Sequence, residues 1–349
     1  MSNNFTVKQL QKIDEVEYNN FVQQLAKNSP AVLGYHYSFY LNILEECNIG
    51  EAYCIGLYDN NNLCAVLPGL IKRSDIGVAY SSMPFFGPNA SILCLQEFET
   101  LEVHQIMINF LINQLSSFPN ILSASFYTPF LSDKINWYND ILQTEFVVDK
   151  NTQYLEIQNT EWSSKIRYDL RKAEKLGLTI STDITDESVN KLYEIYIQNC
   201  TDYAIPPKPK QFVDALATAS KNGENVDFYF SIFENEIVGG LIVVYSASTL
   251  SYYLPCSLDS ARTLQPTTVM IDKAFEKAKK NGLQYWNWEA SPSVESGVFQ
   301  FKKKWGSLSS DYKIFIKTFQ LVEVFKTLGK EKISQEFPYF FVFPFHLIN

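Results

Sequence analysis

One order of secondary-structure elements occurs twice along this chain, and this repeat restricts the possible folds more than any other feature. Hydrophobic periodicity and turn residues predict two helices, a β-hairpin, a strand, a helix and a strand in each half. In the first half these are predicted at 15–27, 37–47, 52–71, 78–82, 96–117 and 121–127. In the second half they are predicted at 186–200, 209–221, 226–245, 250–254, 266–281 and 283–288. A repeat of this size indicates duplicated α/β domains rather than a solenoid.

The length of the chain agrees with a duplication. At 349 residues it exceeds the size at which one hydrophobic core usually stops growing, and 46% hydrophobic residues can form two packed cores. We therefore predict an α/β (α+β) fold with a mixed sheet. The expected N-terminal domain spans residues 1–157 and the expected C-terminal domain spans 158–349.

The charge balance excludes a general attraction to nucleic acid or anionic membranes. The chain has 29 basic and 38 acidic residues, a net charge of −9. Any anion site must therefore be local. The best candidate is a predicted basic helix at 161–176, on which Arg167, Arg171 and Lys175 share one face and are predicted to bind a substrate phosphate. A solvated face remains the alternative. Thr160 is the expected N-cap of this helix and Gly177 its C′ residue.

The sequence carries few signals of metal, thiol or membrane chemistry. Its three histidines lack a second ligand at metal spacing, and its six cysteines form no C-x-x-C pair, so we predict no metal site and reduced core thiols. We expect a cytoplasmic protein, because the sequence has no apolar run long enough to span a membrane and no N-terminal signal. The apolar segment 337–348 is predicted to dock onto the core, with a partner or membrane contact as the alternative.

Short motifs are concentrated between residues 163 and 306. They are SSKIR and LRKAEK in the basic helix, a glycine pair at 239–240, Pro266 opening a helix, WEAS at 288–291 and FK before WG at 301–306. Together with the repeat, these motifs resemble the FemAB-like acyltransferases, a branch of the GNAT superfamily with two GNAT-like domains in one chain. The resemblance implies a degenerate N-terminal copy and an active site in the C-terminal copy. Two departures are a loop at 260–266 without glycine and the lack of a coiled-coil insert.

The resemblance also implies a site for an activated acyl donor, with acyl-CoA favoured. Gly239 and Gly240 would let the donor approach strand 237–245, whose N–H groups would polarise the thioester carbonyl. Arg262, Thr267 and Thr268 would bind its phosphates at the N-terminus of the helix that begins at Pro266. Tight packing at the glycines and an ordinary helix start are the alternative interpretations.

Three residues are candidates for the chemistry itself. Glu289 ends a strand of aromatic and polar residues, which suits a general base with a raised pKa. Lys302 takes the place of the family's FK lysine and is predicted to stabilise the oxyanion or bind donor phosphate. Tyr252 and Tyr253 alternate on their strand, so one is expected to face the site, and Tyr253 is our candidate for protonating the leaving group. The alternative interpretations are that Glu289 caps the segment that begins at Ser291, and that Lys302 belongs to a solvated lysine triplet.

These residues lead to three hypotheses about function. The first is a GNAT-type acyltransferase that acts on the amine or hydroxyl of a small acceptor, such as a sugar or a cell-envelope precursor. The second is FemAB-type peptidyl transfer that depends on aminoacyl-tRNA. The third is a non-catalytic module that binds a ligand on the same fold. Residues 85–88 of the first half are expected to contribute to acceptor binding.

Overall fold

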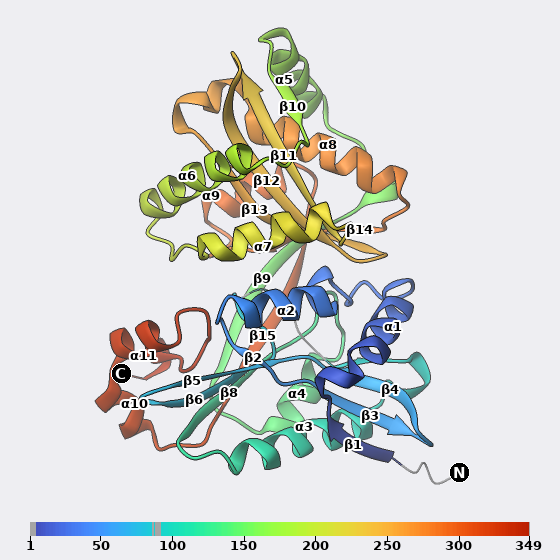
Figure 1. Ribbon diagram of the computed structural model, residues 1–349, viewed down its shortest axis with the longest axis vertical. Helices are drawn as coiled ribbons and strands as arrows, with labels where there is room; N and C mark the ends of the chain where they lie inside the picture. Colours follow the sequence, from blue (N-terminus) through green and yellow to red (C-terminus); the bar gives the residue numbers. More distant parts are fainter. Residues whose placement is uncertain (1–4, 86, 88–91, 349) are drawn as a thin grey trace. The chain divides into compact units, whose positions relative to one another are not determined.

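The computed structural model describes residues 5–85, 87 and 92–348, and the chain forms two compact units (Figure 1). The first unit contains Met1–Val32, His36–Thr152 and Ser310–Asn349, and the second contains Leu33–Tyr35 and Gln153–Ser309. Both units are therefore discontinuous in sequence. The short stretch Leu33–Tyr35 belongs to the second unit although it lies early in the chain. The division of the two sequence repeats at residue 157 stays a prediction.

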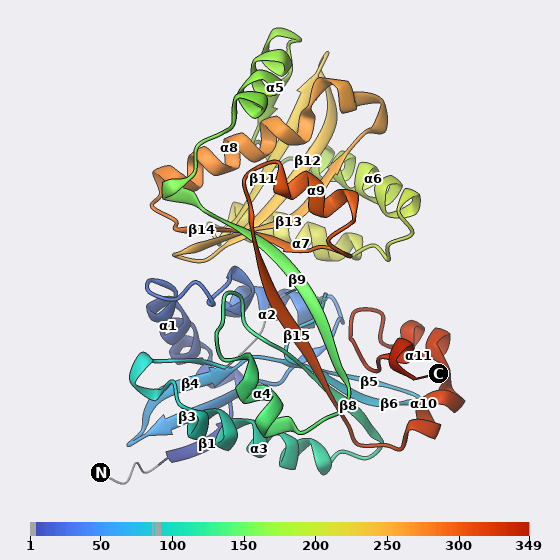
Figure 2. The same cartoon turned by 180° about the vertical axis from the view of Figure 1, so that it is seen from behind.

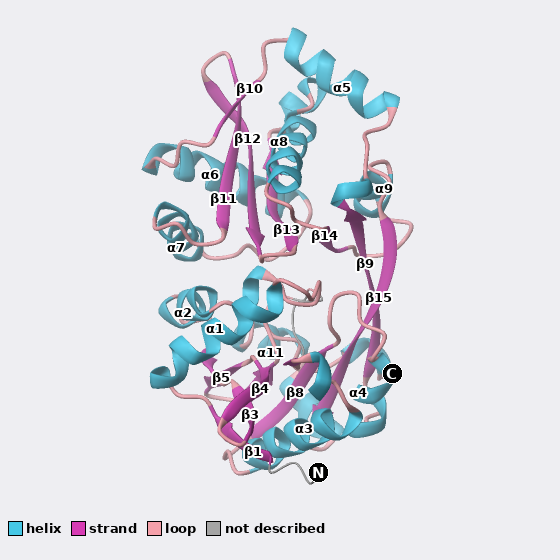
Figure 3. Cartoon of the chain, turned by 90° about the vertical axis from the view of Figure 1, so that its right-hand side faces the viewer, coloured by secondary structure: helices cyan, strands magenta, loops and turns pink. Residues whose placement is uncertain are grey.

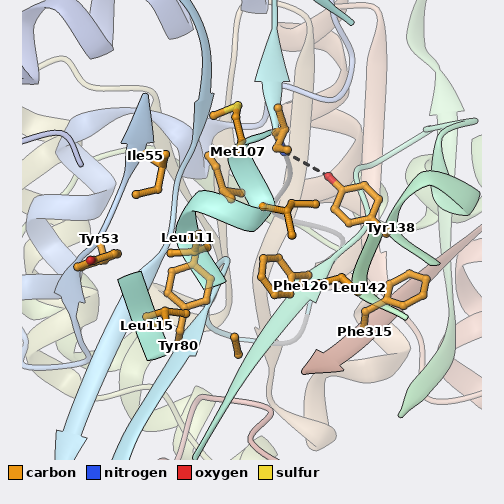
Figure 4. Packing of buried hydrophobic residues seen from close by; sticks show 14 of the residues in the cluster. Tyr53, Ile55, Tyr80, Met107, Leu111, Leu115, Phe126, Tyr138, Leu142 and Phe315 are labelled. Atoms are coloured by element: carbon orange, nitrogen blue, oxygen red, sulfur yellow. Dashed lines mark hydrogen bonds between the residues drawn. The ribbon is translucent and has the colours of Figure 1, made fainter. Parts of the chain in front are cut away.

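The first unit contains two groups of strands and the helices that cover them. One sheet has the order β1 (Phe5–Gln9), β3 (Ile55–Asp59), β4 (Asn62–Leu67), β7 (Leu93–Cys94). The other group has the order β15 (Leu308–Thr318), β8 (Ile121–Tyr127), β6 (Gly77–Ser81), β5 (Leu70–Ser74), β2 (Glu51–Ala52). The helices are α1 (Glu15–Ala26), α2 (Ser38–Glu46), α3 (Leu101–Ser116), α4 (Ile135–Leu142), α10 (Val322–Leu328) and α11 (Lys330–Glu336). Met107, Leu111 and Leu115 of α3 pack in the core with Tyr80 and Phe126 (Figure 4).

The second unit has helices on both faces of one sheet. Its strand order is β10 (Thr179–Ser181), β11 (Val226–Phe233), β12 (Glu236–Tyr245), β13 (Thr249–Ser257), β14 (Tyr285–Ala290). Figure 3 shows α6 (Asp186–Asp202) and α7 (Lys210–Lys221) on one face, and α8 (Pro266–Lys280) on the other, where α5 (Ser164–Lys175) packs against α8. α9 (Gly297–Lys303) follows β14, and both β9 (Val147–Glu156) and β15 contribute residues to both units.

Capping residues and breaker residues account for several differences from the predicted elements. The second strand of the hairpin predicted at 52–71 is in fact two strands, β4 and β5, separated by Pro68 and Gly69. The predicted helix at 96–117 begins only at Leu101, because the Thr100 hydroxyl caps it by accepting the Val103 N–H at 3.2 Å. The sequence predicts one terminal helix at 321–335, but the structure has two, α10 and α11, separated by Gly329 at φ +77°.

The predicted start of the basic helix was wrong and its predicted end is confirmed. The N-cap is Ser163, whose hydroxyl accepts the Ile166 N–H at 3.3 Å. Thr160 instead donates its hydroxyl to the carbonyl of Glu156 at 2.7 Å, before the helix begins. Gly177 follows the C-cap in the left-handed region, at φ +84°, as a C′ glycine does.

The apolar C-terminal segment docks onto the first unit, as predicted. The Ser123 hydroxyl donates to the carbonyl of Val342 at 2.6 Å, and the Phe343 ring stacks on Phe325 with centroids 4.2 Å apart. The ring of Phe146 also packs against the ring of Phe343 in an edge-to-face arrangement, with the centroids 5.1 Å apart. Among the described residues, no helix combines the length and apolar character needed to cross a membrane.

Candidate active site

Two neighbouring strands of the second unit separate at the candidate site. β13 pairs with β12 from Leu250 to Ser257, but in the described chain its parallel pairing with β14 covers only Thr249–Ser251 and Tyr285–Asn287. Beyond this point β14 continues to Glu289 and Ala290. After Ser251, β13 is therefore not joined to β14, and Glu289 lies on the part of β14 beyond this pairing.

Glu289 is fixed by both its side chain and its backbone. Its Oε1 accepts the Tyr35 hydroxyl at 2.6 Å and the Asn287 Nδ2 at 2.8 Å. The Asn287 Oδ1 in turn accepts the Glu289 N–H at 2.9 Å, while the Asn287 Nδ2 also donates to the Ser251 hydroxyl at 3.2 Å. Glu289 has φ +60°, which is uncommon for a residue with a side chain and typical of functional sites.

The surroundings of Glu289 suit a group that takes up a proton. Its side chain is half-buried, and this burial raises the pKa of the carboxyl above its usual range. The hydrogen bond from Tyr35 and the positive charges of Lys302 and Lys208 act in the opposite direction and favour the carboxylate. A carboxylate with a raised pKa that still ionises is the property required of a general base near neutral pH.

Lys302 lies beneath the backbone turn at Glu289. Its side chain is buried, at 3% exposure, and its Nζ donates to the carbonyls of Glu289 (3.0 Å) and Ala290 (2.8 Å) and to the Ser291 hydroxyl (3.0 Å). Burial lowers the pKa of Lys302 to about 7. These contacts use all three donors of an ammonium group and leave none for an oxyanion. The contacts of Lys302 are therefore those of a positioning residue.

Tyr252 and Tyr253 point to different surroundings. Tyr252 is buried in the aromatic core, with its ring 5.1 Å from that of Trp288. A shift in the pairing of β12 with β13 falls at Tyr253, and bulges of this kind redirect side chains near active sites. The Tyr253 ring lies 5.4 Å from the ring of Tyr35 and beneath the Lys208 Nζ at 5.0 Å. Tyr253 is thus the tyrosine beside the partner of Glu289.

Sequence reasoning missed Tyr35, Asn287 and Lys208. Tyr35 comes from a short stretch 254 positions before Glu289, and no local pattern marks it. Asn287 stands between two tryptophans on its strand, a polar position that was available as a signal. Lys208 lies between α6 and α7, where its N–H donates to the Tyr196 hydroxyl at 3.0 Å. Burial lowers the pKa of Lys208 to about 8, and its charge interacts with Glu289.

Gly239 and Gly240 lie inside the sheet, paired with both β11 and β13. A Cβ on Gly240 would lie 2.5 Å from the Leu192 side chain of α6, and one on Gly239 would lie 2.8 Å from the Ser231 Oγ. Close packing therefore accounts for both glycines. Because β12 is paired with a strand on each side along this stretch, its backbone does not offer the donor's acyl arm the pairing that the resemblance implied.

The residues predicted to bind donor phosphates lie around the start of α8. Arg262 forms an ion pair with Asp259 at 2.7 Å and donates to the Tyr203 hydroxyl at 2.8 Å. Thr268 is buried and its hydroxyl donates to the Gln265 Oε1 at 3.2 Å, whereas Thr267 is half-buried in the first turn. The positive charge of Arg262 is therefore partly neutralised.

Arg167, Arg171 and Lys175 are exposed on α5. The Arg167 Nη1 donates to the carbonyl of Trp162 at 2.7 Å. In the part of the chain that the structure describes, none of the three has a hydrogen bond, ion pair or ring contact with the residues around Glu289. The structure thus separates this cationic face from the Glu289 cluster.

Two further expectations concern the loop at 85–88 and metal binding. Phe86 and Pro88 lie outside the described residues, whereas the Phe85 N–H donates to the carbonyl of Tyr339 at 3.1 Å. No group of three or more histidine, cysteine, aspartate or glutamate side chains in the described ranges is arranged to hold a metal ion.

A mixed sheet with helices on both faces, and with two parallel strands that separate beside a half-buried carboxylate, is typical of the GNAT fold. The family model described as "Acetyltransferase (GNAT) domain" matches residues 162–293. No curated protein matches the chain significantly.

Solved structures match over almost the whole chain. The FemX crystal structure is similar over 88% of this chain and 96% of its own, with a TM-score of 0.67 and 11% identity. A tandem GNAT protein from the clavulanic acid biosynthesis pathway matches 91% of this chain and 99% of its own (TM-score 0.55, 7% identity). The C-terminal domain of a putative lysylphosphatidylglycerol synthetase from Agrobacterium fabrum matches 92% and 97% (TM-score 0.56, 10% identity). The chain therefore has a FemAB-like GNAT fold, and its residues 162–293 match the model of the GNAT acetyltransferase domain.

Proposed function

We propose that this protein transfers an acyl or aminoacyl group from an activated carrier to the amine or hydroxyl of a small acceptor. Acyl-CoA is the favoured donor, and a sugar or a cell-envelope precursor is the favoured acceptor class. The observation that carries the proposal is the position of Glu289. A half-buried carboxylate with a raised pKa stands on β14 just beyond the last residues that pair β13 with β14.

The proposed mechanism is direct attack in a ternary complex. The acceptor nitrogen attacks the donor's acyl carbon while Glu289 takes a proton from the nitrogen, so that a C–N bond forms. The tetrahedral intermediate collapses, the C–S bond of the thioester breaks, and the thiolate takes a proton from the Tyr253 phenol. Glu289 and Tyr253 then return to their resting states by proton exchange with solvent.

The remaining residues position these groups. The part of β13 around Tyr253, which no longer pairs with β14, would receive the donor's acyl arm. Tyr35 and Asn287 orient the Glu289 carboxylate, and Lys302 holds the backbone on which it stands. Thr267, Thr268 and the N–H groups of the first turn of α8 would bind the donor's phosphates. Arg262 could bind these phosphates only if its guanidinium released its ion pair with Asp259.

A second donor, aminoacyl-tRNA, is favoured by the cationic face of α5. Five basic residues of this helix are exposed and none forms an ion pair within the described residues: Lys165, Arg167, Arg171, Lys172 and Lys175. A polyanion would gain affinity from such a face by releasing counterions. Binding of charged tRNA that weakens steeply with salt would favour this donor over acyl-CoA.

The proposal is tested by donor binding followed by turnover. Calorimetry with acetyl-CoA and longer acyl-CoAs should detect saturable binding, and a panel of amino sugars and amino acids should reveal an acceptor through release of free CoA. If neither acyl-CoA nor charged tRNA binds, the proposed transfer is wrong. If a donor binds and no acceptor supports turnover, the non-catalytic module becomes the better account.

A further inference from the structure

The C-terminal segment forms one wall of a cavity in the first unit. The cavity has a volume of about 380 Å³, within the range of small-molecule pockets. It lies among β9, β15, α11 and the segment that follows α11; Figure 2 shows α10, α11 and the C-terminal end gathered together. Its lining residues are Lys150, Ile314, Lys330, Ile333, Ser334, Phe340, Phe341, Val342, Phe343, Phe345 and His346.

The apolar wall of this cavity is built into the fold. Ile314, Ile333 and Val342 are at most 4% exposed, so their positions are set by the core. The backbone of the C-terminal segment is held by the hydrogen bond from Ser123 to Val342, and Phe343 is held by its stacking on Phe325. A ligand would therefore meet a preformed surface of aromatic and aliphatic side chains, which lowers the entropic cost of binding.

The charged residues of the lining are all basic. Lys150 and Lys330 supply ammonium groups and His346 an imidazole. Among the described residues no carboxylate lines the cavity, although acidic residues outnumber basic ones in the chain by 38 to 29. The acid next to Lys150 in sequence, Asp149, forms an ion pair with Lys313 at 2.8 Å instead. Lys150 is half-buried and Lys330 is exposed. An apolar wall with a cationic rim complements an amphiphilic anion.

We propose that this cavity binds a long-chain acyl anion as a single molecule, with its hydrocarbon tail against the phenylalanines and its carboxylate near Lys150 and Lys330. Charge complementarity selects the anion over a neutral lipid, and the concave aromatic wall, with a volume of about 380 Å³, suits one hydrocarbon chain better than a membrane surface. The proposal is independent of the Glu289 site, because all the lining residues belong to the first unit. It adds a lipid ligand to a protein whose proposed chemistry lies in the second unit.

The test is a fluorescence titration of the full chain with 11-(dansylamino)undecanoate, followed by competition with palmitate below its micellar concentration. Lys330→Glu should weaken the affinity by about fivefold to tenfold, because it replaces an attractive charge with a repulsive one. Lys332→Glu is the matched control, because it makes the same charge reversal on the same helix at a residue outside the lining. The affinity of this variant for the probe should stay within about twofold of the wild-type value. Methyl palmitate should compete equally with the probe in both variants.

A second pair of variants tests the location without changing charge. Ser334→Trp places a large side chain in the cavity and should abolish probe binding, whereas Gln335→Trp, the next residue on α11, should not. Absence of saturable binding to the wild type would overturn the proposal, as would equal effects of Lys330→Glu and Lys332→Glu. Binding only to anionic vesicles, and not to monomeric palmitate, would also overturn it and would assign this face to membrane contact.

Discussion

Replacing Tyr35 with phenylalanine removes one hydroxyl from the site and leaves the buried ring in place. The Tyr35 side chain is 1% exposed, and its hydroxyl donates to the Glu289 Oε1 at 2.6 Å. Hydrogen bonds to charged groups contribute about 1.5–3 kcal/mol. Because this bond favours the carboxylate, its loss raises the pKa of Glu289, and the base is then protonated over a wider pH range.

The expected result is a shift in the pH profile rather than a uniform loss of rate. With about 1.4 kcal/mol per factor of ten, kcat/KM on the acid side should fall about 10- to 150-fold. The deficit should shrink as the pH rises, because Glu289 ionises in the variant as well. The assay is kcat/KM against pH with the best donor and acceptor found in the turnover screen.

Tyr229→Phe is the matched control for this experiment. It removes another buried hydroxyl of the second unit that donates to a carboxylate, the Asp227 Oδ2 at 3.3 Å, away from the Glu289 cluster. Its profile should match that of the wild type. An acid limb that stays in place in a folded Tyr35→Phe protein would refute the argument that Tyr35 tunes the base.

Three further predictions concern stability. Burial lowers the pKa of Lys302 to about 7 from 10.5, so between these pH values the unfolded chain binds more protons than the folded one. In urea unfolding, the stability of the wild type relative to Lys302→Met should therefore rise from pH 7 to pH 10. A stability difference that stays constant over this range would contradict the prediction. Gly240→Ala should lower the stability by about 1–3 kcal/mol, and with it the Tm, because the new methyl group overpacks against Leu192. Gly297→Ala is the control, because its methyl group would meet open space and should leave the Tm unchanged. Equal Tm values for the two variants would contradict the packing role of Gly240. Ser163→Ala should lower the free energy of unfolding by about 1 kcal/mol because it removes the N-cap of α5, and Thr160→Ala should lower it by less. If urea unfolding shows the larger loss for Thr160→Ala, Thr160 is the cap instead.

Local signals predicted most elements of the fold because each depends on neighbouring residues. Strand β8 occurs at its predicted bounds, the hairpin predicted at 226–245 forms as β11 and β12, and Gly177 marks the end of α5. The errors occur where two local signals compete. Both Thr160 and Ser163 can cap a helix, and only the tertiary course of the chain, which ties Thr160 to Glu156, decides between them.

The candidate site could be predicted only in part, for a physical reason. Glu289 and Lys302 lie in short motifs, so the sequence shows both. Whether Lys302 faces a substrate or the backbone depends on how α9 packs beneath the turn at Glu289, which no local pattern shows. Tyr35, in a short 3-10 helix, and Lys208, between α6 and α7, reach the site from distant parts of the chain. Interactions across such separations leave no periodic pattern in the sequence.

The central claim is that Glu289 is the general base of an acyl transfer, and single-turnover kinetics of Glu289→Gln test it most directly. Glutamine keeps the size of the side chain and removes its basicity, so the rate of transfer should fall about 10²- to 10⁴-fold while the donor Kd is unchanged. Glu295→Gln, in the exposed loop that follows β14, should keep the wild-type rate. Full single-turnover activity in a folded Glu289→Gln protein would contradict the account.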